Sequence, residues 1–408
     1  MSIPPWILAT YGWVLGAGAV ATILAWGVVW WRVEQSIRGV PTLRYGQALA
    51  EADPPTGRVC VVVPAHNESR VIANLVRSLR AETYRELAIV LALDRCTDDT
   101  ASLARAGIAG DARFEIVEID ACPADWAGKV HAVHMGVTRS RGAVDAQYLL
   151  FADADTEFSP GCIAASLAML RERRLDLLSL LSTLAHETWF ERVVQTAASV
   201  ELMRQYPLTL ANAHIERRAF ANGQFMLFTR AAYEAVGGHA AVKGALLEDL
   251  AFARRLAAAK RNTGVFLAAG LFRCRMYADW PQFRRGWKRI YTEAADRKPR
   301  RLSLSARRIR WLGTLLPIWM LGAAPLGLFL IPQNPAAGWT LTALGLLAIF
   351  VWLGALLRIA TLSRAPAWTA PLHIVGAWLT GALLDEAASD LRSRTPTRWG
   401  GREYDLGA

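Results

Sequence analysis

Hydrophobic residues follow two patterns along this chain, and the first is a set of long runs near its two ends. Three runs contain no charged residue: Ile7–Trp31, Trp311–Ile331 and Ala337–Leu357. As a helix, each is long enough to cross a hydrocarbon layer about 30 Å thick. We therefore predict three transmembrane helices, and the first is too long and too aromatic for a cleaved signal peptide.

A fourth apolar run, Pro366–Leu384, carries Pro371 and His373. Interrupted apolar segments are commonly interfacial or re-entrant, because only a closed helix satisfies its own backbone in lipid. We expect this run to be re-entrant or to lie at the membrane surface. The tail that begins at Ser389 would then face the same side as the region between the first two spans.

The second pattern lies between the spans, where short apolar runs alternate with amphipathic stretches. The runs predict buried strands at 59–64, 87–93, 114–119 and 147–151, and the stretches predict helices at 67–80, from about 98, and at 129–138. This alternation favours an α/β domain with a mostly parallel sheet, whose ligands bind at the carboxyl ends of the strands.

Acidic residues follow three of the predicted strands. Glu68 follows the first, Asp94 the second, and Asp153 and Asp155 the fourth. Two carboxylates at the end of a buried strand can hold a hard cation such as Mg²⁺ or Mn²⁺, which shares its ligands with phosphate oxygens. The Asp-x-Asp pattern is common in ordinary loops, so its meaning depends on the motifs around it.

Composition and charge place these patterns in a membrane. With 53% hydrophobic residues and 16 Trp in 408 residues, the chain is too apolar for one soluble domain. The net charge of +11 is concentrated beside the predicted spans, at residues 32–44 and 297–310. By the positive-inside rule this puts residues 32–310 in the cytoplasm of a multi-pass inner (cell) membrane protein. No nucleic-acid-binding motif accompanies the charge, so we expect the bilayer, and not nucleic acid, as the partner.

The cysteines and histidines show no ligand pattern. None of the five cysteines forms a Cys-x-x-Cys pair, and no metal-ligand spacing relates His131, His134, His186, His214 and His239. We expect free thiols, and neither a zinc site nor a histidine metal site.

The two patterns divide the chain into five parts. They are an N-terminal anchor at 1–32, a juxtamembrane linker at 33–56, an α/β domain with interface helices at 57–296, transmembrane or interfacial helices at 297–385, and a tail at 386–408. All candidate chemistry described so far then falls in the α/β domain.

Six short motifs occur in a fixed order through that domain. They are Pro64-Ala65-His66-Asn67-Glu68, Asp94–Thr100, Trp126-Ala127-Gly128-Lys129, Asp153-Ala154-Asp155, Ala221-Asn222-Gly223-Gln224 and Glu248-Asp249. This series resembles the family-two glycosyltransferases, which have the Rossmann-like GT-A fold. Within that family, Gly237-Gly238-His239, Arg275-Met276-Tyr277 and the tail motif Trp399–Tyr404 are similar to bacterial membrane enzymes that glycosylate carotenoid, hopanoid and ceramide lipids.

The resemblance implies a nucleotide-sugar donor and assigns five residues to bind it: Ala65, Glu68, Asp94, Lys129 and Asp153. Lys129 would meet the diphosphate at the start of a helix. Many family members have two adjacent acids where this chain has Leu93-Asp94, so the base contact can differ here. Without the resemblance, Asp94 reads as a helix cap or turn residue and Lys129 as an exposed helix residue.

The resemblance also implies the catalytic groups. Asp249 would be the general base that deprotonates the acceptor hydroxyl in an inverting reaction. Asp155 would hold a divalent cation, Mg²⁺ or Mn²⁺, that neutralises charge on the leaving diphosphate. For the neighbouring Glu248 we favour a simpler role, an acid that interacts with the dipole of the helix that follows it.

Contacts to the donor sugar or the acceptor are implied for Asn222, Gly223, Gln224, Glu248, Arg285 and Trp287. The first three also read as a tight turn before a strand. Arg285 and Trp287 belong to a segment similar to the family's Gln-x-x-Arg-Trp motif, here interrupted by Gly286. In a processive polysaccharide synthase the uninterrupted motif stacks on the acceptor sugar. A basic amphipathic interface helix is the alternative reading of this segment.

The sequence therefore predicts a membrane-anchored, metal-dependent, inverting glycosyltransferase. Its donor would be a nucleotide sugar, with UDP-sugars the commoner class in the family, and its acceptor a hydroxyl or carboxyl group of a lipid. A processive polysaccharide synthase and a non-catalytic nucleotide-sugar-binding membrane protein are the alternatives. A transporter or channel is disfavoured, because the spans carry almost no ionisable residues.

Overall fold

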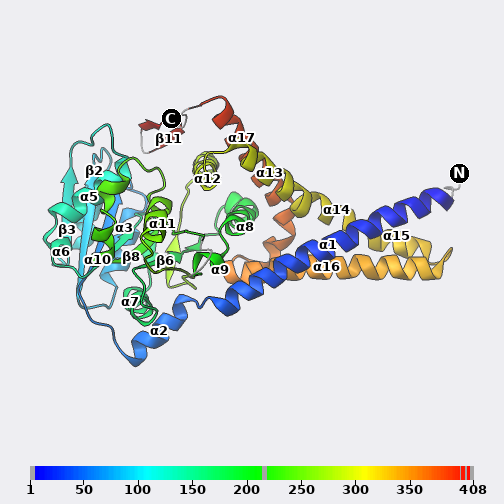
Figure 1. Ribbon diagram of the computed structural model, residues 1–408, viewed down its shortest axis with the longest axis horizontal. Helices are drawn as coiled ribbons and strands as arrows, with labels where there is room; N and C mark the ends of the chain where they lie inside the picture. The colour runs from blue at the N-terminus through cyan, green and yellow to red at the C-terminus, as the bar shows by residue number, and fades with distance from the viewer. Residues whose placement is uncertain (1–4, 214–217, 396, 400–401, 405–408) are drawn as a thin grey trace.

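The protein has an α/β domain at one end and a long helical region at the other (Figure 1). The computed structural model describes residues 5–213, 218–395, 397–399 and 402–404. His214 and the Gly400-Gly401 pair of the tail motif lie outside these residues. The N-terminal helix runs along the helical region toward the α/β domain, and the last two strands lie near that domain (Figure 1).

A seven-stranded sheet forms the centre of the α/β domain, in the order β3-β2-β1-β4-β8-β6-β9. Its strands are β1 (Val59–Ala65), β2 (Leu87–Asp94), β3 (Phe114–Ile119), β4 (Tyr148–Ala152), β6 (Leu177–Leu181), β8 (Phe225–Thr229) and β9 (Thr263–Leu267). All adjacent pairs are parallel except those of β8 with β4 and β6, which are antiparallel. The predicted mostly parallel α/β sheet is confirmed.

Both faces of this sheet are covered, and strand β1 shows how. Val59, Val61 and Val63 pack in one hydrophobic core, and Cys60 and Val62 in the core on the opposite face. Burial on both faces explains why β1 reads as one apolar run and not as an alternating strand. The helices of the domain are α3 (Ile72–Arg80), α4 (Thr100–Ile108), α5 (Gly128–Arg139), α6 (Arg141–Val144), α7 (Cys162–Glu172), α10 (Arg230–Ala235), η2 (His239–Val242) and α11 (Glu248–Ala258).

The helix expected at 67–80 begins later, at Ile72. Asn67 has a left-handed backbone, with φ 57°, and its Oδ1 accepts the N–H of Thr97 at 2.8 Å. The N–H of Glu68 is donated to Thr100 Oγ1 at 2.7 Å. These bonds hold residues 67–69 in a turn that carries Glu68 at the end of β1.

A second, three-stranded sheet was not expected from the sequence. It has the order β5-β10-β7 and consists of β5 (Thr156–Phe158), β10 (Phe272–Cys274) and β7 (Thr183–Leu184). Asp155 directly precedes β5, and its carbonyl accepts the N–H of Arg275, directly after β10, at 3.0 Å. This small sheet therefore joins the Asp-x-Asp motif to two segments that are distant in sequence.

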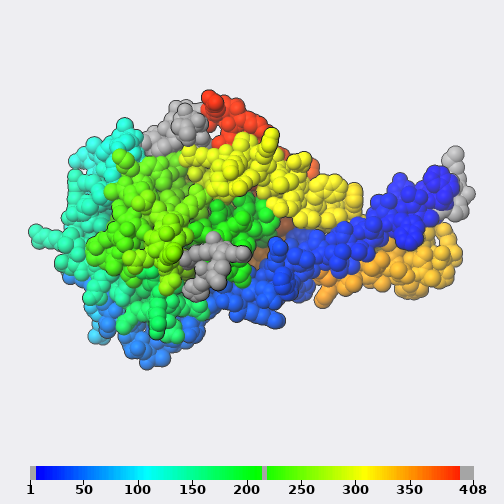
Figure 2. Space-filling model, in the orientation of Figure 1, coloured from blue at the N-terminus to red at the C-terminus, as the bar shows by residue number. Residues whose placement is uncertain are grey.

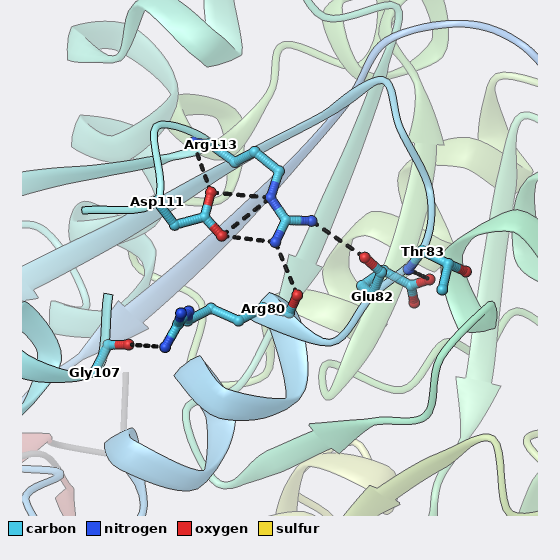
Figure 3. A network of polar contacts seen from close by, with 6 residues as sticks. All are labelled: Arg80, Glu82, Thr83, Gly107, Asp111 and Arg113. Carbon is cyan, nitrogen blue, oxygen red and sulfur yellow. Dashed lines mark hydrogen bonds and ion pairs between the residues drawn. The ribbon is translucent and has the colours of Figure 1, made fainter. Parts of the chain in front are cut away.

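A polar network closes the opposite end of the strands (Figure 3). Arg113 donates to Asp111 Oδ2 at 2.7 Å and to the carbonyls of Arg80 (2.9 Å) and Glu82 (3.2 Å). The Glu82 carboxylate, buried at 4% exposure, accepts the N–H groups of Thr83, Gly161 and Ile163. Because this network ties helix ends together away from the carboxyl ends of β1, β2 and β4, we interpret it as structural.

Long helices form the narrow projection in Figure 2. They are α1 (Pro5–Gly39), η3 (Trp311–Leu315), α14 (Leu316–Leu321), α15 (Ala323–Leu330) and α16 (Pro335–Ser363). Four stretches are long and apolar enough to cross a membrane: Trp6–Ala52, Pro299–Leu330, Pro335–Ser363 and Ala367–Arg392. After α1, helix α2 (Leu43–Ala52) packs on α7, where a Cβ on Gly46 would lie 2.3 Å from the Ala165 carbonyl oxygen.

A layer of helices lies between the projection and the α/β domain (Figure 1). It contains η1 (Glu191–Gln195), α8 (Thr196–Gln205), α9 (Leu208–Ala211), α12 (Trp280–Ala294), α13 (Pro299–Arg310), η4 (Ala367–Leu372) and α17 (His373–Arg392). Pro371 lies in η4, so α17 itself runs without a break. Helix α17 packs in one hydrophobic cluster with α12 and α13. The tail continues into β11 (Thr397–Trp399) and β12 (Arg402–Tyr404).

Candidate active site

The predicted site residues gather at one edge of the main sheet. Ala65 and Asp94 end β1 and β2, and Asp153 follows β4. Because β8 is antiparallel to β4, with Ala152 opposite Phe225, the turn at 222–224 before β8 lies at the same edge. Helix α11 begins there with Glu248 and Asp249. Residues from five separate motifs are thus brought together.

Lys129 connects the two sides of this edge. Its Nζ lies 2.7 Å from Asp153 Oδ1 and 2.5 Å from Glu248 Oε1. Burial opposes the positive charge, but the two carboxylates outweigh it and raise the pKa of Lys129. Lys129 is therefore a charged group inside the site and not an exposed helix residue.

Glu248 has a larger role than the dipole interaction favoured from its sequence. Its side chain is buried, at 4% exposure for the residue, and it pairs directly with Lys129. That partner comes from α5, far away in sequence, and Glu248 also lies in the first turn of α11, where the dipole interaction favoured from its sequence would act. A buried carboxylate of this kind needs such a partner, since an isolated buried charge is strongly unfavourable.

Asp249 is held at the start of α11 by two backbone donors. Its Oδ2 accepts the N–H of Gly223 at 2.8 Å, and its Oδ1 accepts the N–H of Leu250 at 2.7 Å. Burial, and then the charge of Glu248, raise the pKa of Asp249 to about 6. A Cβ on Gly223 would lie 3.2 Å from both Asp249 Oδ2 and Glu248 Oε1. The glycine lets the backbone approach these carboxylates closely.

Asp155 is the carboxylate whose charge is least compensated. Burial, then Asp153 and Glu68, raise the pKa of Asp155 to about 8. Its Oδ1 is buried and accepts no hydrogen bond from the described residues. Cys274 in β10, one of five free thiols, lies nearby, and burial raises the pKa of Cys274. A cation would compensate this oxygen.

The donor set around Asp155 fits a cation completed by substrate. Within the described ranges, no group of three or more His, Cys, Asp or Glu side chains is arranged to hold a metal. A magnesium-type ion is commonly held by one or two carboxylates and completed by substrate phosphates and water. The orphaned Oδ1 and the surplus of negative charge fit that type of site.

Three of the predicted donor-binding residues lie at the ends of β1 and β2. Ala65 is buried at 2% exposure. Asp94, also 2% exposed, is fixed by Arg95, whose Nε and Nη2 lie 2.8 and 2.6 Å from its two oxygens. Burial, then Asp153 and Asp98, raise the pKa of Glu68 to about 7. Asp94 therefore presents Arg95, and not a bare carboxylate, to this edge.

The residues before β8 make a compact turn. Asn222 Nδ2 donates to the Leu180 carbonyl at 2.8 Å and to Gln224 Oε1 at 3.1 Å. Gln224 also bonds to Ser182 and is 7% exposed. The side-chain amides of Asn222 and Gln224 are thus bonded to each other, to the end of β6 and to Ser182 directly after it, while the N–H of Gly223 is donated to Asp249.

Arg285 and Trp287 are not brought into the site in the same way. Trp287 is 2% exposed and packs between Phe283 (6.1 Å) and Tyr291 (5.4 Å between ring centroids). Arg285 is exposed. The interrupting Gly286 has a structural reason, because a Cβ there would lie 2.2 Å from the Tyr277 hydroxyl.

Two residues near the site were missed as site residues. Tyr277 is 6% exposed, and burial together with Asp155 and Asp153 contributes to a raised pKa of Tyr277. Arg289 lines a small cavity with Lys129 and Glu248, and Arg289 acts to lower the pKa of Asp153. Arg289 lies three residues after Gly286 in α12. Residues three apart in a helix lie on the same face, so this spacing could have indicated that Arg289 points the same way as Gly286.

Comparisons with known proteins identify the family of the chain. A family model described as glycosyltransferase-like family 2 matches residues 54–314, more than half of the chain. A search of curated proteins finds no match. Among solved structures, the mannosyltransferase PcManGT from Pyrobaculum calidifontis, in complex with GDP-Man and Mn²⁺, is similar with a TM-score of 0.48 and 17% identity, over 93% of this chain and 99% of that chain.

Two further solved structures show a lower similarity. TarS 1–349 from S. aureus, in complex with UDP-GlcNAc, has a TM-score of 0.41 and 14% identity, over 86% of this chain and 97% of that chain. Glucosyl-3-phosphoglycerate synthase from Mycobacterium tuberculosis, in complex with Mn²⁺, UDP and glucosyl-3-phosphoglycerate, has a TM-score of 0.37 and 17% identity, over 62% of this chain and 82% of that chain.

Proposed function

The chain belongs to glycosyltransferase family 2, and from that premise we propose that it transfers a sugar, with inversion, from a nucleotide sugar to a hydroxyl or carboxyl group of a membrane lipid. The observation that carries this proposal is Asp249. Its carboxylate is oriented by two backbone N–H groups and has a pKa of about 6. Such a group is ionised at neutral pH and basic enough to accept a proton in the transition state.

In the proposed reaction, Asp249 removes the proton of the acceptor hydroxyl as its oxygen forms a bond to the anomeric carbon. The bond from that carbon to the diphosphate breaks, and the nucleoside diphosphate leaves with the electron pair. Lys129, at the start of α5 between Asp153 and Glu248, is placed to interact with the diphosphate as its charge develops. The family resemblance favours a UDP-sugar as the donor.

We assign a divalent cation to Asp155, with Asp153 beside it. The support is the orphaned Oδ1 and the raised pKa of Asp155, which a bound cation would reverse. When bound, Mg²⁺ or Mn²⁺ supplies Lewis-acid neutralisation of the diphosphate oxygens. Glu68 adds negative charge to the same region.

Because Arg95 bonds to both oxygens of Asp94, we propose that the nucleobase of the donor binds elsewhere. A cavity of about 430 Å³ lies between the end of β3 and helix α5, lined by residues that include Ile119, His131 and Met135. This volume is within the usual range for small-molecule sites. Met135→Trp, which fills the cavity, should raise the KM for the donor and leave kcat unchanged, and an unaltered KM would place the base elsewhere.

The lipid acceptor is supported by the helical region. The helices long enough to cross a membrane expose apolar residues such as Trp13, Leu24, Phe350 and Leu346. We propose three spans, formed by α1, by η3 with α14 and α15, and by α16, with α17 at the inner surface. The α/β domain and the tail would then both face the cytoplasm, as the clusters of arginine also favour. We retain the five-part division of the chain on this basis.

A processive polysaccharide synthase is supported less well. Its acceptor motif needs a tryptophan face free to stack on a sugar, whereas Trp287 is buried in a hydrophobic cluster. We therefore prefer transfer of a single sugar to a lipid.

The direct test incubates membranes containing the protein with radiolabelled nucleotide sugars. We expect label in a chloroform-soluble product, abolished by EDTA and restored by Mn²⁺ or Mg²⁺. A labelled water-soluble polymer would identify a synthase. Tight donor binding without hydrolysis or transfer would identify a binding protein and overturn the proposal.

A further inference from the structure

Two tryptophans from distant parts of the chain are in contact with each other. The ring centroids of Trp189 and Trp280 are 5.0 Å apart, at an interplanar angle of 41°. Trp189 is 53% exposed. Trp280 also stacks on Phe283, with centroids 5.4 Å apart at 19°, and Phe283 belongs to a hydrophobic core. The ring of Trp189 is thus exposed to solvent, while the ring of Trp280 is held by Phe283.

The register of the small sheet puts this pair near Asp155. Cys274 on β10 lies opposite Thr156 on β5 and Leu184 on β7. The segments that leave β7 and β10 therefore start at the end where Asp155 enters β5. Trp280 lies five residues after Arg275, whose N–H is bonded to the Asp155 carbonyl. Five extended residues span at most about 18 Å, so Trp280 lies within about that distance of Arg275. A lipid headgroup with part of its chain is long enough to cover this distance.

The loop that carries Trp189 is fixed before any ligand arrives. Side chains of η1 hold its backbone: Glu191 accepts the N–H groups of Glu187 and Thr188 at 2.8 Å each, Gln195 donates to the Ala185 carbonyl at 2.8 Å, and Arg192 donates to the His186 carbonyl at 3.0 Å. Glu191 is 1% exposed. An exposed aromatic ring on a rigid loop loses little conformational entropy on binding.

The same surface continues to the helices proposed to enter the membrane. Arg192 lies over the ring of Trp368, 5.9 Å from its centroid, and Trp368 on η4 is 61% exposed. Just after α16, Arg364 donates to the Ala269 carbonyl at 2.9 Å, in the loop that leads into β10. Tryptophan beside a cation is typical of the interface between lipid and water. The segment that carries Trp189 is thus linked through Arg192 to Trp368, and the segment that leads to Trp280 is linked through Arg275 to Asp155.

We propose that Trp189 and Trp280 form a platform that holds the polar headgroup of a lipid acceptor beside Asp155, while the chains of the acceptor stay in the bilayer next to η4 and the end of α16. The proposal rests on the lipid acceptor of the proposed function. The flat rings supply apolar contact to the headgroup, and the exposed Glu187–Arg275 ion pair next to them supplies polar partners. This role replaces the acceptor contact expected from the buried Trp287.

The test uses the full-length protein in phosphatidylcholine vesicles that contain the polar lipid extract of the source organism, with a radiolabelled UDP-sugar. The extract is diluted stepwise with phosphatidylcholine, and chloroform-soluble label is measured. Trp189→Ala should raise the apparent KM for the extract about three- to tenfold, as expected for losing an aromatic contact. Its KM for the donor, and donor hydrolysis by water, should be unchanged. Trp189→Phe should restore part of the loss.

Trp378→Ala is the matched control, because Trp378 is 49% exposed on α17 and is not part of the platform. A wild-type KM for the extract in Trp189→Ala would overturn the platform. Equal losses in Trp189→Ala and Trp378→Ala, with weaker vesicle binding in both, would assign the ring to membrane anchoring and also overturn it. If the wild type labels no lipid but hydrolyses the donor, the lipid acceptor itself is wrong.

Discussion

The site at the edge of the main sheet and the layer of helices next to the α/β domain both carry many charged side chains. The two regions differ in how the negative charges are neutralised. At the sheet edge, four carboxylates lie around Lys129, namely Asp153, Asp155, Glu248 and Asp249. A fifth, Glu68, lies near Asp155, and Arg289 lies near Asp153. In the helical layer, each acid near the end of α17 has a base as partner: Asp385 pairs with Arg310, Glu386 with Arg284 and Lys288, and Asp390 with Lys288.

We interpret the uncompensated carboxylates at the sheet edge as functional, and the ion pairs of the helical layer as structural. At the edge, burial raises the pKa of Glu68 to about 7, of Asp249 to about 6 and of Asp155 to about 8. A surplus of partly buried negative charge is unfavourable until a cation or a proton arrives, so it is typical of functional sites. Paired charges in the layer orient helices and need no ligand.

The largest effect should come from removing the carboxylate that has the least compensation. Asp155→Ala should abolish transfer, because the cation proposed there loses its protein ligand, and EDTA should do the same to the wild type. Asp125→Ala, which removes an exposed acid that forms an ion pair with Lys243, should retain activity. Full transfer by Asp155→Ala in metal-free membranes would remove the metal from this edge.

A smaller loss should follow from Asp249→Asn, which keeps the volume of the side chain but cannot take a proton. Turnover should fall about 10²- to 10⁴-fold, the usual contribution of a general base. The donor Kd should stay within about threefold, or ~0.65 kcal/mol, because the donor is assigned to residues on the other side of Lys129. Single-turnover kinetics and donor titration measure the two quantities. A variant that loses donor binding together with turnover would place the base elsewhere.

The comparison also predicts a stability effect of the surplus charge. The pKa of Asp155 in the folded protein, about 8, lies above that of the unfolded chain, so its contribution favours folding at low pH and is lost as the pH rises from about 4 to about 8. Metal-free Asp155→Asn should therefore unfold at a higher temperature than the metal-free wild type at pH 8.5. The difference should shrink at pH 5. Equal midpoints at pH 8.5 would show that the charge is compensated.

The smallest effect is expected in the helical layer. Asp385→Asn breaks a pair with Arg310 in which the acid is 43% and the base 23% exposed. Pairs of this exposure contribute about 1 kcal/mol or less. The unfolding midpoint should change little and the turnover not at all. A loss of turnover comparable to that of Asp249→Asn would mean that the layer takes part in catalysis.

The sequence predicted the first four strands of the main sheet, and it did not predict the second, small sheet. Strands β1, β2 and β4 could be read because each is an apolar run buried on both faces. The edge strand β3 is only partly buried and was read from its apolar residues. Parallel pairing then brings the ends of these strands together. The small sheet could not be read, because β5 and β10 have three residues each and β7 has two. Such short strands form only when segments distant in sequence meet.

The candidate site shows the same limit. The family resemblance predicted a shared site for Asp153, Asp155 and Asp249 from the order of the motifs. The parallel sheet predicted that the strand ends in this site lie at one edge. The Lys129–Glu248 pair joins residues more than a hundred positions apart, so no local pattern could reveal it. The burial of Trp287 depends on Phe283 and Tyr291 on its own helix and on helices α8 and α17, which the motif alone does not describe.

Helix α1 gives the molecule a fixed height. Its 35 residues, at 1.5 Å each, give a length of about 52 Å, which exceeds the roughly 30 Å thickness of a hydrocarbon core. The helix leads into α2, which packs closely on α7 at Gly46. With α1 in the bilayer, as we propose, its length and this contact would set the distance between the bilayer and the candidate active site. The proposed lipid acceptor would then have to present its hydroxyl at that distance, so the length of a headgroup would select substrates as well as its shape.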